Sequence, residues 1–543
     1  MFLPSGRVSS HASHVALDGR NCLKKEAGKT KSGVLEMISL EKNAKIEKWV
    51  FFPALFLSVA MIACIYLFPS RSEIVINEAF NFCTVKIGWV YILSCFLSFG
   101  FLIWLSCSRY AGNKFGGEDS QPTYSYFSWT AMLFTAGVGL SVVILGFLEP
   151  IYYVSNPPFE LEAFSSEAYE YAHMYGQFHW GLSAWAFYNP AIVAVAYSLF
   201  VKKQNKLSLG NACMSIFEGN GKIKRIMGYF VDILVVFGVI ASISTSLGLG
   251  TPVIGLAIRR LLGLSDDYTF VVCVGILLVW IMIFGTSVFL GLDKGIKNLS
   301  LINLILAGGF MLLILFVGPT NEILKMEVNS VGLYMQNFIR LSTWMAPFGD
   351  SSFVENWTIF YWGWWIAFMP MMGMFVARIS QGRTVREVVW GQMLWGSAGC
   401  ALSFMVFGGY TLFLQKNGIV DISGILRSGG QGKAILAILD TLPFPEVTTV
   451  FFCVLCFIYL ATTIDSCAYV LAGTTTTEMR HGEEPARWNR LIWAAIFCAS
   501  SIGLLFIDGF KAVQTISIVA GLPLIGVLVI LMLVSAKMLK HLA

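Results

Sequence analysis

Twelve apolar blocks separated by short polar stretches follow one another along the chain. Each is long enough for an α-helix that crosses a bilayer, which needs about 20 apolar residues. The pattern therefore predicts an all-α integral membrane protein with twelve transmembrane helices. The expected spans lie near residues 48–68, 87–107, 126–148, 178–201, 227–256, 269–292, 298–318, 355–377, 389–415, 446–476, 489–507 and 512–536.

The polar stretches between these blocks differ in charge. Residues 202–225 contain six basic side chains and one acid, Glu218, whereas 149–177 contains five glutamates and no Lys or Arg. Because Lys and Arg in short loops stay in the cytoplasm, we expect 202–225, 378–387 and 479–490 inside and 149–177 outside. Both termini then lie in the cytoplasm, as an even number of spans requires.

Two further polar regions lie outside the expected spans. Residues 1–47 are polar and lysine-containing, which predicts a disordered cytoplasmic tail, and translation from Met1 or from Met37 is compatible with it. Residues 327–345 place apolar side chains such as Val331, Met335 and Phe338 at helical spacing. They predict an amphipathic helix along the outer surface, used for membrane anchoring or for subunit contact.

Composition agrees with a membrane protein and argues against other classes. Of the 543 residues, 56% are hydrophobic and 13% are charged, against about 25% charged in soluble domains. The net charge of +5 is dispersed in short runs, which gives no support to nucleic-acid binding. The 12 Cys lie mostly in apolar blocks, and the six His show no metal-ligand spacing, so a disulfide scaffold, an enzyme and a tightly bound cofactor are not expected.

The eighth block carries an aromatic stripe. Helical spacing puts Trp357, Tyr361, Trp364, Phe368 and Met372 on one face, with Trp365 beside it. Packing or an interfacial aromatic belt is the alternative interpretation. Belts form at helix ends, whereas Trp364 and Trp365 stand near the middle of this span, so the stripe favours a binding surface.

The fourth block carries a second aromatic face. On a continuous helix Trp180, Tyr188 and Trp185 fall at about 0°, 80° and 140°. Indole faces attract cations, and a quaternary ammonium group cannot donate hydrogen bonds, so aromatic faces are its natural partners. We therefore expect a cargo with that group. His179 is expected to pack or gate helices rather than to carry a proton.

Two polar features complete the candidate site. Gly137, Gly139 and Ser141 are spaced by two, which makes no single helical face and favours local unwinding over close helix contact. In the tenth span, Thr462, Thr463 and Ser466 flank Asp465, a costly residue within a membrane. These hydroxyls and the carbonyls freed by unwinding suit Na⁺, although hydrogen bonding between helices would also explain them.

The segment from Glu355 to Glu387 resembles the signature of the betaine/choline/carnitine transporter family, and the likeness extends over about residues 48–538. The resemblance implies a homotrimer in the bacterial inner membrane and alternating access through a tryptophan box. It also implies a five-plus-five inverted repeat. The expected divisions are a tail (1–47), two peripheral helices (48–125), the first repeat (126–318), the outer helix (319–354), the second repeat (355–538) and a short cytoplasmic tail (539–543).

The resemblance also assigns site residues. By it, Trp364, Trp365 and Phe368 line a central box, and Phe368 stands where Trp or Tyr is usual. Trp180, Trp185 and Tyr188 match an outer aromatic station. Tyr152 aligns with a tyrosine of the carnitine branch of the family, and Met372 is also similar to that branch.

The coupling ion is the open question. The carnitine/γ-butyrobetaine antiporter has an arginine in span seven where Asn303 stands here, and it lacks the hydroxyl pair Thr462 and Thr463. Sodium-coupled members place hydroxyls where Val239 and Ile243 stand, which leaves Ser246. We expect transport of a quaternary ammonium zwitterion, carnitine, γ-butyrobetaine or a related betaine, with one Na⁺ site. The alternatives are sodium-independent exchange of carnitine for γ-butyrobetaine, and symport of choline, glycine betaine or another small solute such as an amino acid.

Overall fold

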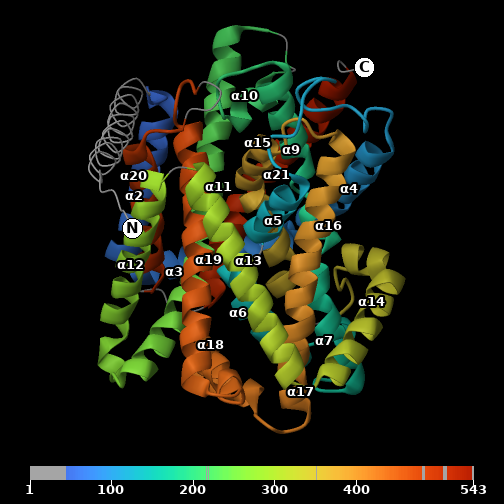
Figure 1. Ribbon diagram of the computed structural model, residues 1–543, viewed down its shortest axis with the longest axis vertical. Helices are drawn as coiled ribbons and strands as arrows, with labels where there is room; N and C mark the ends of the chain where they lie inside the picture. Colours follow the sequence, from blue (N-terminus) through green and yellow to red (C-terminus); the bar gives the residue numbers. More distant parts are fainter. Residues whose placement is uncertain are drawn as a thin grey trace, which may run out of the picture.

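The computed structural model describes residues 45–137, 139–215, 217, 219–290, 292–349, 351–479, 484–505 and 510–540 (Figure 1). These residues form helices joined by loops, and their only β-pairing is two isolated bridges. The predicted all-α fold is confirmed. The bilayer interior contains no water to hydrogen-bond backbone groups, so helices, which satisfy their own backbone hydrogen bonds, are favoured there. The proposed start at Met1 or Met37 lies outside the described residues.

The helices of the N-terminal half include several short, interrupted ones. In chain order they are α2 (Lys48–Leu67), α3 (Pro69–Asn81), η1 (Phe82–Lys86), α4 (Gly88–Cys107), α5 (Tyr126–Gly137), α6 (Leu140–Ser155), η2 (Pro158–Glu160), α7 (Ser166–His179), α8 (Leu182–Ala186), α9 (Asn189–Ala196), η3 (Tyr197–Val201), α10 (Leu209–Met214), α11 (Gly221–Leu262), η4 (Asp266–Tyr268), α12 (Thr269–Leu290) and α13 (Leu292–Val317).

The C-terminal half begins with the outer helix. Its helices are α14 (Thr320–Thr343), η5 (Val354–Thr358), α15 (Ile359–Ile379), α16 (Val385–Ser403), η6 (Phe404–Gly408), α17 (Gly409–Lys416), α18 (Ile422–Leu439), α19 (Pro445–Thr474), α20 (Arg487–Leu505) and α21 (Phe510–Lys540).

Helices occupy all twelve predicted spans. In the described part of the chain, nine helices are long and apolar enough to cross a membrane by length and composition, or ten if the bent pair Leu301–Val317 and Thr320–Thr343 is one span. The span predicted at 126–148 is divided between α5 and α6, each shorter than a full crossing. The one predicted at 489–507 corresponds to α20.

The bundle is organised around α11, α15, α19 and α21 (Figure 1). The 42-residue α11 packs against α21, α19, α20 and α15, and α15 packs against α21 and α9. Elements of the two predicted halves are therefore interleaved. Among the described helices long enough to cross a membrane, the one at Val354–Ile379, which contains α15, is the most completely enclosed, with 94% of its apolar part buried inside the chain, so its tryptophans face protein and not lipid.

Two predicted segments differ from the helices found. The stretch 149–177 is not a loop, because α6 continues to Ser155 and α7 begins at Ser166. Glu149 is consequently a buried helical residue. At the C-terminal end, α21 continues to Lys540, two residues into the segment predicted as a short tail (539–543).

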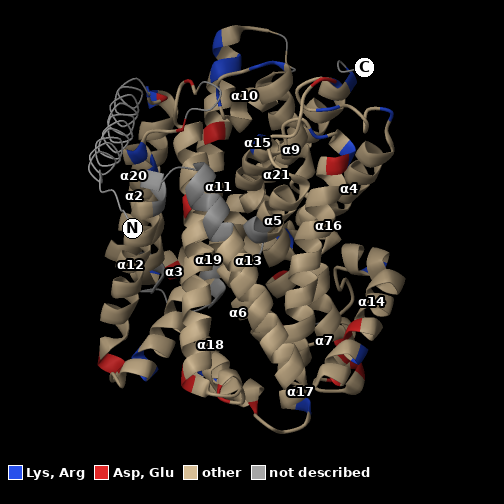
Figure 2. Ribbon diagram, viewed as in Figure 1, with Lys and Arg blue, Asp and Glu red and all other residues tan. Residues whose placement is uncertain are grey.

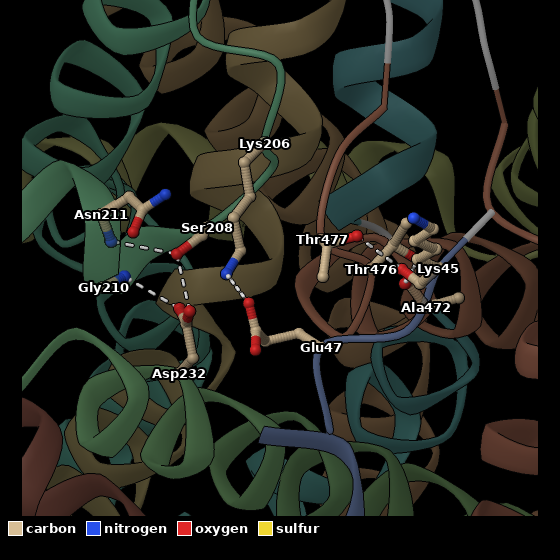
Figure 3. A network of polar contacts seen from close by, with 10 residues as sticks. All are labelled: Lys45, Glu47, Lys206, Ser208, Gly210, Asn211, Asp232, Ala472, Thr476 and Thr477. Carbon is tan, nitrogen blue, oxygen red and sulfur yellow. Dashed lines mark hydrogen bonds and ion pairs between the residues drawn. The ribbon is translucent and has the colours of Figure 1, made fainter. Parts of the chain in front are cut away.

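The last residues of the predicted N-terminal tail are ordered against the bundle (Figure 3). The backbone N–H of Glu47 donates to the Thr475 carbonyl (2.8 Å), and Thr477 donates to the Lys45 carbonyl (2.9 Å). The Glu47 carboxylate pairs with Lys206 (3.3 Å), next to the Ser208–Asp232 hydrogen bond. Residues 45–47 thus tie the end of α19 to the loop before α10.

Asp465, the costly membrane aspartate, has a charged partner. Arg490 of α20 donates to its carboxylate at 2.5 Å, and both side chains are buried. Arg490 also pairs with Glu484 (3.1 Å). Asp465 therefore contributes to packing between α19 and α20, a role that its own sequence neighbourhood did not indicate.

Candidate functional site

A cavity with an empty volume of about 530 Å³ lies in the middle of the bundle. It is lined by parts of the interrupted third span, by α7, α11, α15 and α19, and by Tyr188 beside α9. The lining residues are Gly139, Leu140, Ser141, Trp180, Tyr188, Ser246, Trp364, Trp365, Phe368, Leu460 and Thr463.

The third span is interrupted where the glycines predict it. Helix α5 ends at Gly137 and α6 begins at Leu140, and Gly139 between them has an extended backbone (φ −92°, ψ −176°). The predicted unwinding is confirmed. Because the first N–H groups of a helix lack intrahelical acceptors and carry partial positive charge, the start of α6 presents donors at the cavity wall.

The aromatic side chains form one compact cluster. The ring of Trp180 lies 5.7 Å from Trp364 and 5.5 Å from Trp365 between centroids. Trp365 is also 5.3 Å from Tyr188, and Trp364 donates its indole N–H to the Ser242 carbonyl of α11 (3.3 Å). Indole planes thus approach the cavity from several directions, the arrangement that attracts a cation.

The expected division into a central and an outer aromatic station is wrong in geometry. Trp180 and Tyr188 line the same cavity as Trp364 and Trp365. The helical-phase argument for span four fails because the helix stops at Trp180 and Gly181 is extended (φ −97°, ψ −150°) before α8. The break turns residues from α7 and from the turn before α9 towards one space.

Four of the predicted substrate-binding residues lie outside the cavity lining. Trp185 stands behind it, 5.5 Å from the Trp365 ring, and donates to the Trp180 carbonyl (3.2 Å). Tyr152 packs on Trp357 (5.2 Å) and accepts a hydrogen bond from Gln431 (3.2 Å). Met372 is buried in α15, and Gly137 ends α5.

The polar part of the cavity wall consists of hydroxyl groups. Ser141 donates to Ser246 (3.2 Å), and Thr463 lies opposite Gly139, 3.6 Å from where a Cβ on that glycine would stand. Thr462 and Ser466 do not line the cavity. Thr462 accepts from Asn303 (2.9 Å) and donates to the Ile458 carbonyl, while Ser466 donates to the Thr462 carbonyl.

Glu149 is the main residue that the sequence analysis did not assign to the site. Its carboxylate accepts hydrogen bonds from the Trp180 indole (3.0 Å), the Tyr153 hydroxyl (2.7 Å) and the Tyr361 hydroxyl. The sequence places it just before Pro150 at the expected end of a span, where a solvated acid is ordinary. Leu140, Leu460 and Ser246 complete the lining, and nothing in their local sequence distinguishes the two leucines.

The cavity has aromatic walls, lies inside a bundle of membrane-crossing helices and is lined in part by an interrupted helix. These features together are typical of a multi-pass membrane transporter. Over residues 49–543 the chain matches the model of the betaine/carnitine/choline transporter family, and it belongs to that family. Members of this family are transporters, not enzymes.

Two bacterial relatives cover most of the chain. The glycine betaine transporter OpuD of Bacillus subtilis (strain 168) is 34% identical over 491 residues, 90% of this chain and 93% of OpuD. The uncharacterized transporter YeaV of Escherichia coli (strain K12) is 32% identical over 437 residues, 80% of this chain and 89% of YeaV. Among solved structures, a substrate-bound, outward-open Na⁺-coupled sialic acid symporter matches with a TM-score of 0.44 at 13% identity, over 81% of this chain and 84% of that one.

Proposed function

We propose that this protein is a secondary transporter of zwitterionic quaternary ammonium compounds, carnitine, γ-butyrobetaine or a related betaine, by alternating access. The observation that carries the proposal is the cluster of Trp180, Trp364 and Trp365 around one buried cavity. A trimethylammonium group gains cation–π attraction there and leaves no hydrogen-bond donor unsatisfied. The glycine betaine transport named for OpuD supports the same cargo class.

The carboxylate of such a cargo would lie at the polar part of the cavity wall. The start of α6 supplies backbone N–H donors, and a helix N-terminus favours negative charge. The polar and the aromatic parts of the wall thus suit the two charged groups of a zwitterion. Choline, which lacks the carboxylate, would use only the aromatic wall, so we place it after the betaines as an alternative cargo.

We further propose Na⁺ as the coupling ion, close to Thr463. Hard oxygen ligands suit this ion, and Thr463 faces the interrupted backbone at Gly139. Asn303 supports the assignment, because it stands beside Thr462 (2.9 Å) and is uncharged, so it cannot substitute for a cation as an arginine would. Thr462 and Ser466 keep free lone pairs that could complete the ligand set, and the ion would supply positive charge close to the cargo carboxylate.

Uptake by purified protein in liposomes tests the cargo. Trp365→Leu removes an indole face, which is worth about 2 kcal/mol in a desolvated site, so binding of labelled carnitine or glycine betaine should weaken by about 25-fold or more. Uptake then falls to background while expression is retained. The control is Trp390→Leu, on the exposed side of α16. Unchanged uptake by the Trp365 variant would remove the aromatic cavity from the mechanism.

Counterflow with and without a Na⁺ gradient tests the coupling. We expect uptake to require Na⁺, and Thr463→Ala to raise the Na⁺ concentration needed for half-maximal rate. Steady carnitine/γ-butyrobetaine exchange in sodium-free buffer would instead establish the exchanger alternative.

Assembly and orientation are also proposals. Lys and Arg gather at the end of the molecule that carries α10 and the C-terminus, and acids are common at the opposite end around α7 and α14 (Figure 2). Since basic loops stay in the cytoplasm, we place that first end, with both termini, on the cytoplasmic side of a bacterial inner membrane. We also propose a homotrimer, in which the exposed apolar side chains of α14 would contact a neighbouring copy.

A further inference from the structure

A buried carboxyl group stands directly behind the aromatic cavity without a basic partner. The side chain of Glu149 is fully buried, and its three hydrogen-bond partners within the described chain are Tyr153, Trp180 and Tyr361. Three donors stabilise a carboxylate, whereas isolation from water and from positive charge disfavours one. The charged and neutral forms are therefore brought close in free energy.

The same carboxyl is connected to an imidazole. The Tyr153 hydroxyl lies 2.9 Å from His179 Nδ1, and His179 Nε2 lies 3.1 Å from Thr358 Oγ1. We name Glu149, Tyr153, His179 and Thr358 the Glu149 chain. A helix-packing role, which the sequence suggested for His179, does not require both ring nitrogens to be hydrogen-bonded in this way.

The Glu149 chain can hold or release one proton with all its hydrogen bonds retained. With the proton bound, the carboxylic acid donates to Tyr153, Tyr153 donates to His179 Nδ1, and Nε2–H donates to Thr358. With it released, Thr358 donates to Nε2, Nδ1–H donates to Tyr153, and Tyr153 donates to the carboxylate. Apart from the proton itself, the two states differ only in the rotation of hydroxyl groups and in the tautomer of His179.

The charge of Glu149 acts on the cavity through Trp180 and Tyr361. Trp180 lines the cavity and donates its indole N–H to Glu149, and the Tyr361 ring stacks 6.2 Å from Trp364. Donation to an anion increases the electron density of a ring, which strengthens its attraction for a cation. The negative charge itself adds Coulomb attraction in a site with little water.

We propose that the Glu149 chain is a proton-binding site linked to the aromatic cavity. A quaternary ammonium ligand binds preferentially to the form without the proton, and its binding to the protonated form releases the proton. The inference rests on the proposed cargo class. By reciprocity, the proton and the ligand weaken each other's binding by the same factor. Affinity for the ligand is therefore full at high pH and is lost as pH falls.

Other titratable groups lie close to the Glu149 chain. Tyr361 donates to Glu149 itself. Tyr175 and His173 lie on α7, Glu327 and Arg340 on α14, Cys400 on α16 and Tyr459 on α19, and Glu355 lies in η5 with Thr358. His173 is turned to Ser330 (2.7 Å), and Arg340 lies over the ring of Phe159 (4.5 Å). Tyr175 packs on His179 by ring contact (5.3 Å).

Calorimetry on the purified full-length protein tests the linkage. Choline, glycine betaine and carnitine are titrated in buffers of different ionisation enthalpy, across about pH 5–8, the range in which histidines titrate. We expect proton release on binding, and an apparent Kd that rises by up to about tenfold per unit of falling pH, as exchange of one proton requires. Binding without proton release at any pH in this range overturns the proposal.

Single-residue variants test whether Glu149 is the group that binds the proton. Glu149→Gln keeps an acceptor oxygen for Trp180 but cannot titrate, so it should bind without proton release and without pH dependence. Glu327→Gln is the matched control, because that carboxylate also accepts a side-chain hydrogen bond, from Gln177 (2.5 Å), away from the cavity. It should retain the proton release of the unmodified protein. Undiminished release from Glu149→Gln would overturn the assignment.

Infrared spectroscopy gives a readout that needs no ligand and separates this proposal from the cargo. The unmodified protein should show a protonated-carboxyl band that disappears as pH rises and is weaker in Glu149→Gln. If that band titrates but none of the three compounds binds, the proposed cargo fails and the linkage fails with it. If the compounds bind and the band is absent at every pH, only the proton site is wrong.

Discussion

Gly396 of α16 holds the cavity wall in place without lining it. A Cβ at this position would overlap the six-membered ring of Trp185, which supports Trp365 at 5.5 Å between ring centroids. Cores are packed at crystal-like density, so an added methyl group moves its neighbours. Trp185 cannot retreat easily, since its indole N–H is bonded to the Trp180 carbonyl and its own carbonyl accepts from Gln392 (2.8 Å).

Gly396→Ala should therefore weaken cargo binding although it adds no atom to the cavity. We expect a loss of about 1–3 kcal/mol, the usual cost of overpacking, divided between stability and affinity. Equilibrium binding and thermal unfolding of the purified variant measure the two parts. Gly100→Ala, at a position in α4 with open space around it, should leave both unchanged. Equal affinities in the two variants would contradict the supporting role of Trp185.

At the scale of elements, the pair Asp465–Arg490 fastens α19 to α20. Both side chains are buried, and the guanidinium of Arg490 also lies over the ring of Tyr469 (5.7 Å). Removal of one partner from a buried ion pair leaves an uncompensated charge, whereas replacement of both by apolar groups is often tolerated. Position 463, proposed for Na⁺, lies two residues from Asp465, so this fastening also holds the ion site.

Arg490→Met should lower stability by about 3–5 kcal/mol, the usual cost of an orphaned buried charge. Thermal unfolding of the detergent-solubilised protein measures the effect. The double variant Asp465→Leu with Arg490→Met should recover most of the loss, because neither charge remains. A double variant no more stable than the single one would show that the interaction with Glu484, or another contact of Arg490, matters more.

At the scale of the whole molecule, α14 presents an apolar stripe that its own chain does not cover. Val328 and Met335 are 77% and 76% exposed, and Ile339 continues the row at helical spacing. Such a stripe is used for lipid or for another subunit. The helix stands at the edge of the bundle (Figure 1), where a neighbouring copy could reach it.

Val328→Asp combined with Met335→Asp should convert the proposed trimer to monomers, because desolvating two carboxylates in an interface costs more than the contact provides. Mass measurement of the purified protein in detergent distinguishes the two states. Thr343→Asp, at an exposed position at the end of α14, should leave assembly unchanged. Persistence of trimers in the double variant would assign the stripe to lipid.

The sequence alone determined the membrane architecture and much of the binding chemistry. Apolar blocks of spanning length become helices because a bilayer permits few other backbone structures, and the glycine spacing before Leu140 indicated the break that is found there. The tryptophans of α15 were identified correctly as inward-facing because aromatic belts lie at helix ends.

Only the tertiary structure decided how these parts meet. The break at Gly181 brings Trp180 and Tyr188 into the cavity of Trp364 and Trp365, and no helical phase could show it because phase assumes a continuous helix. Glu149 gains its role from partners up to 212 residues away in sequence. A local pattern records burial on average, whereas hydrogen bonds between distant segments depend on how the whole bundle packs.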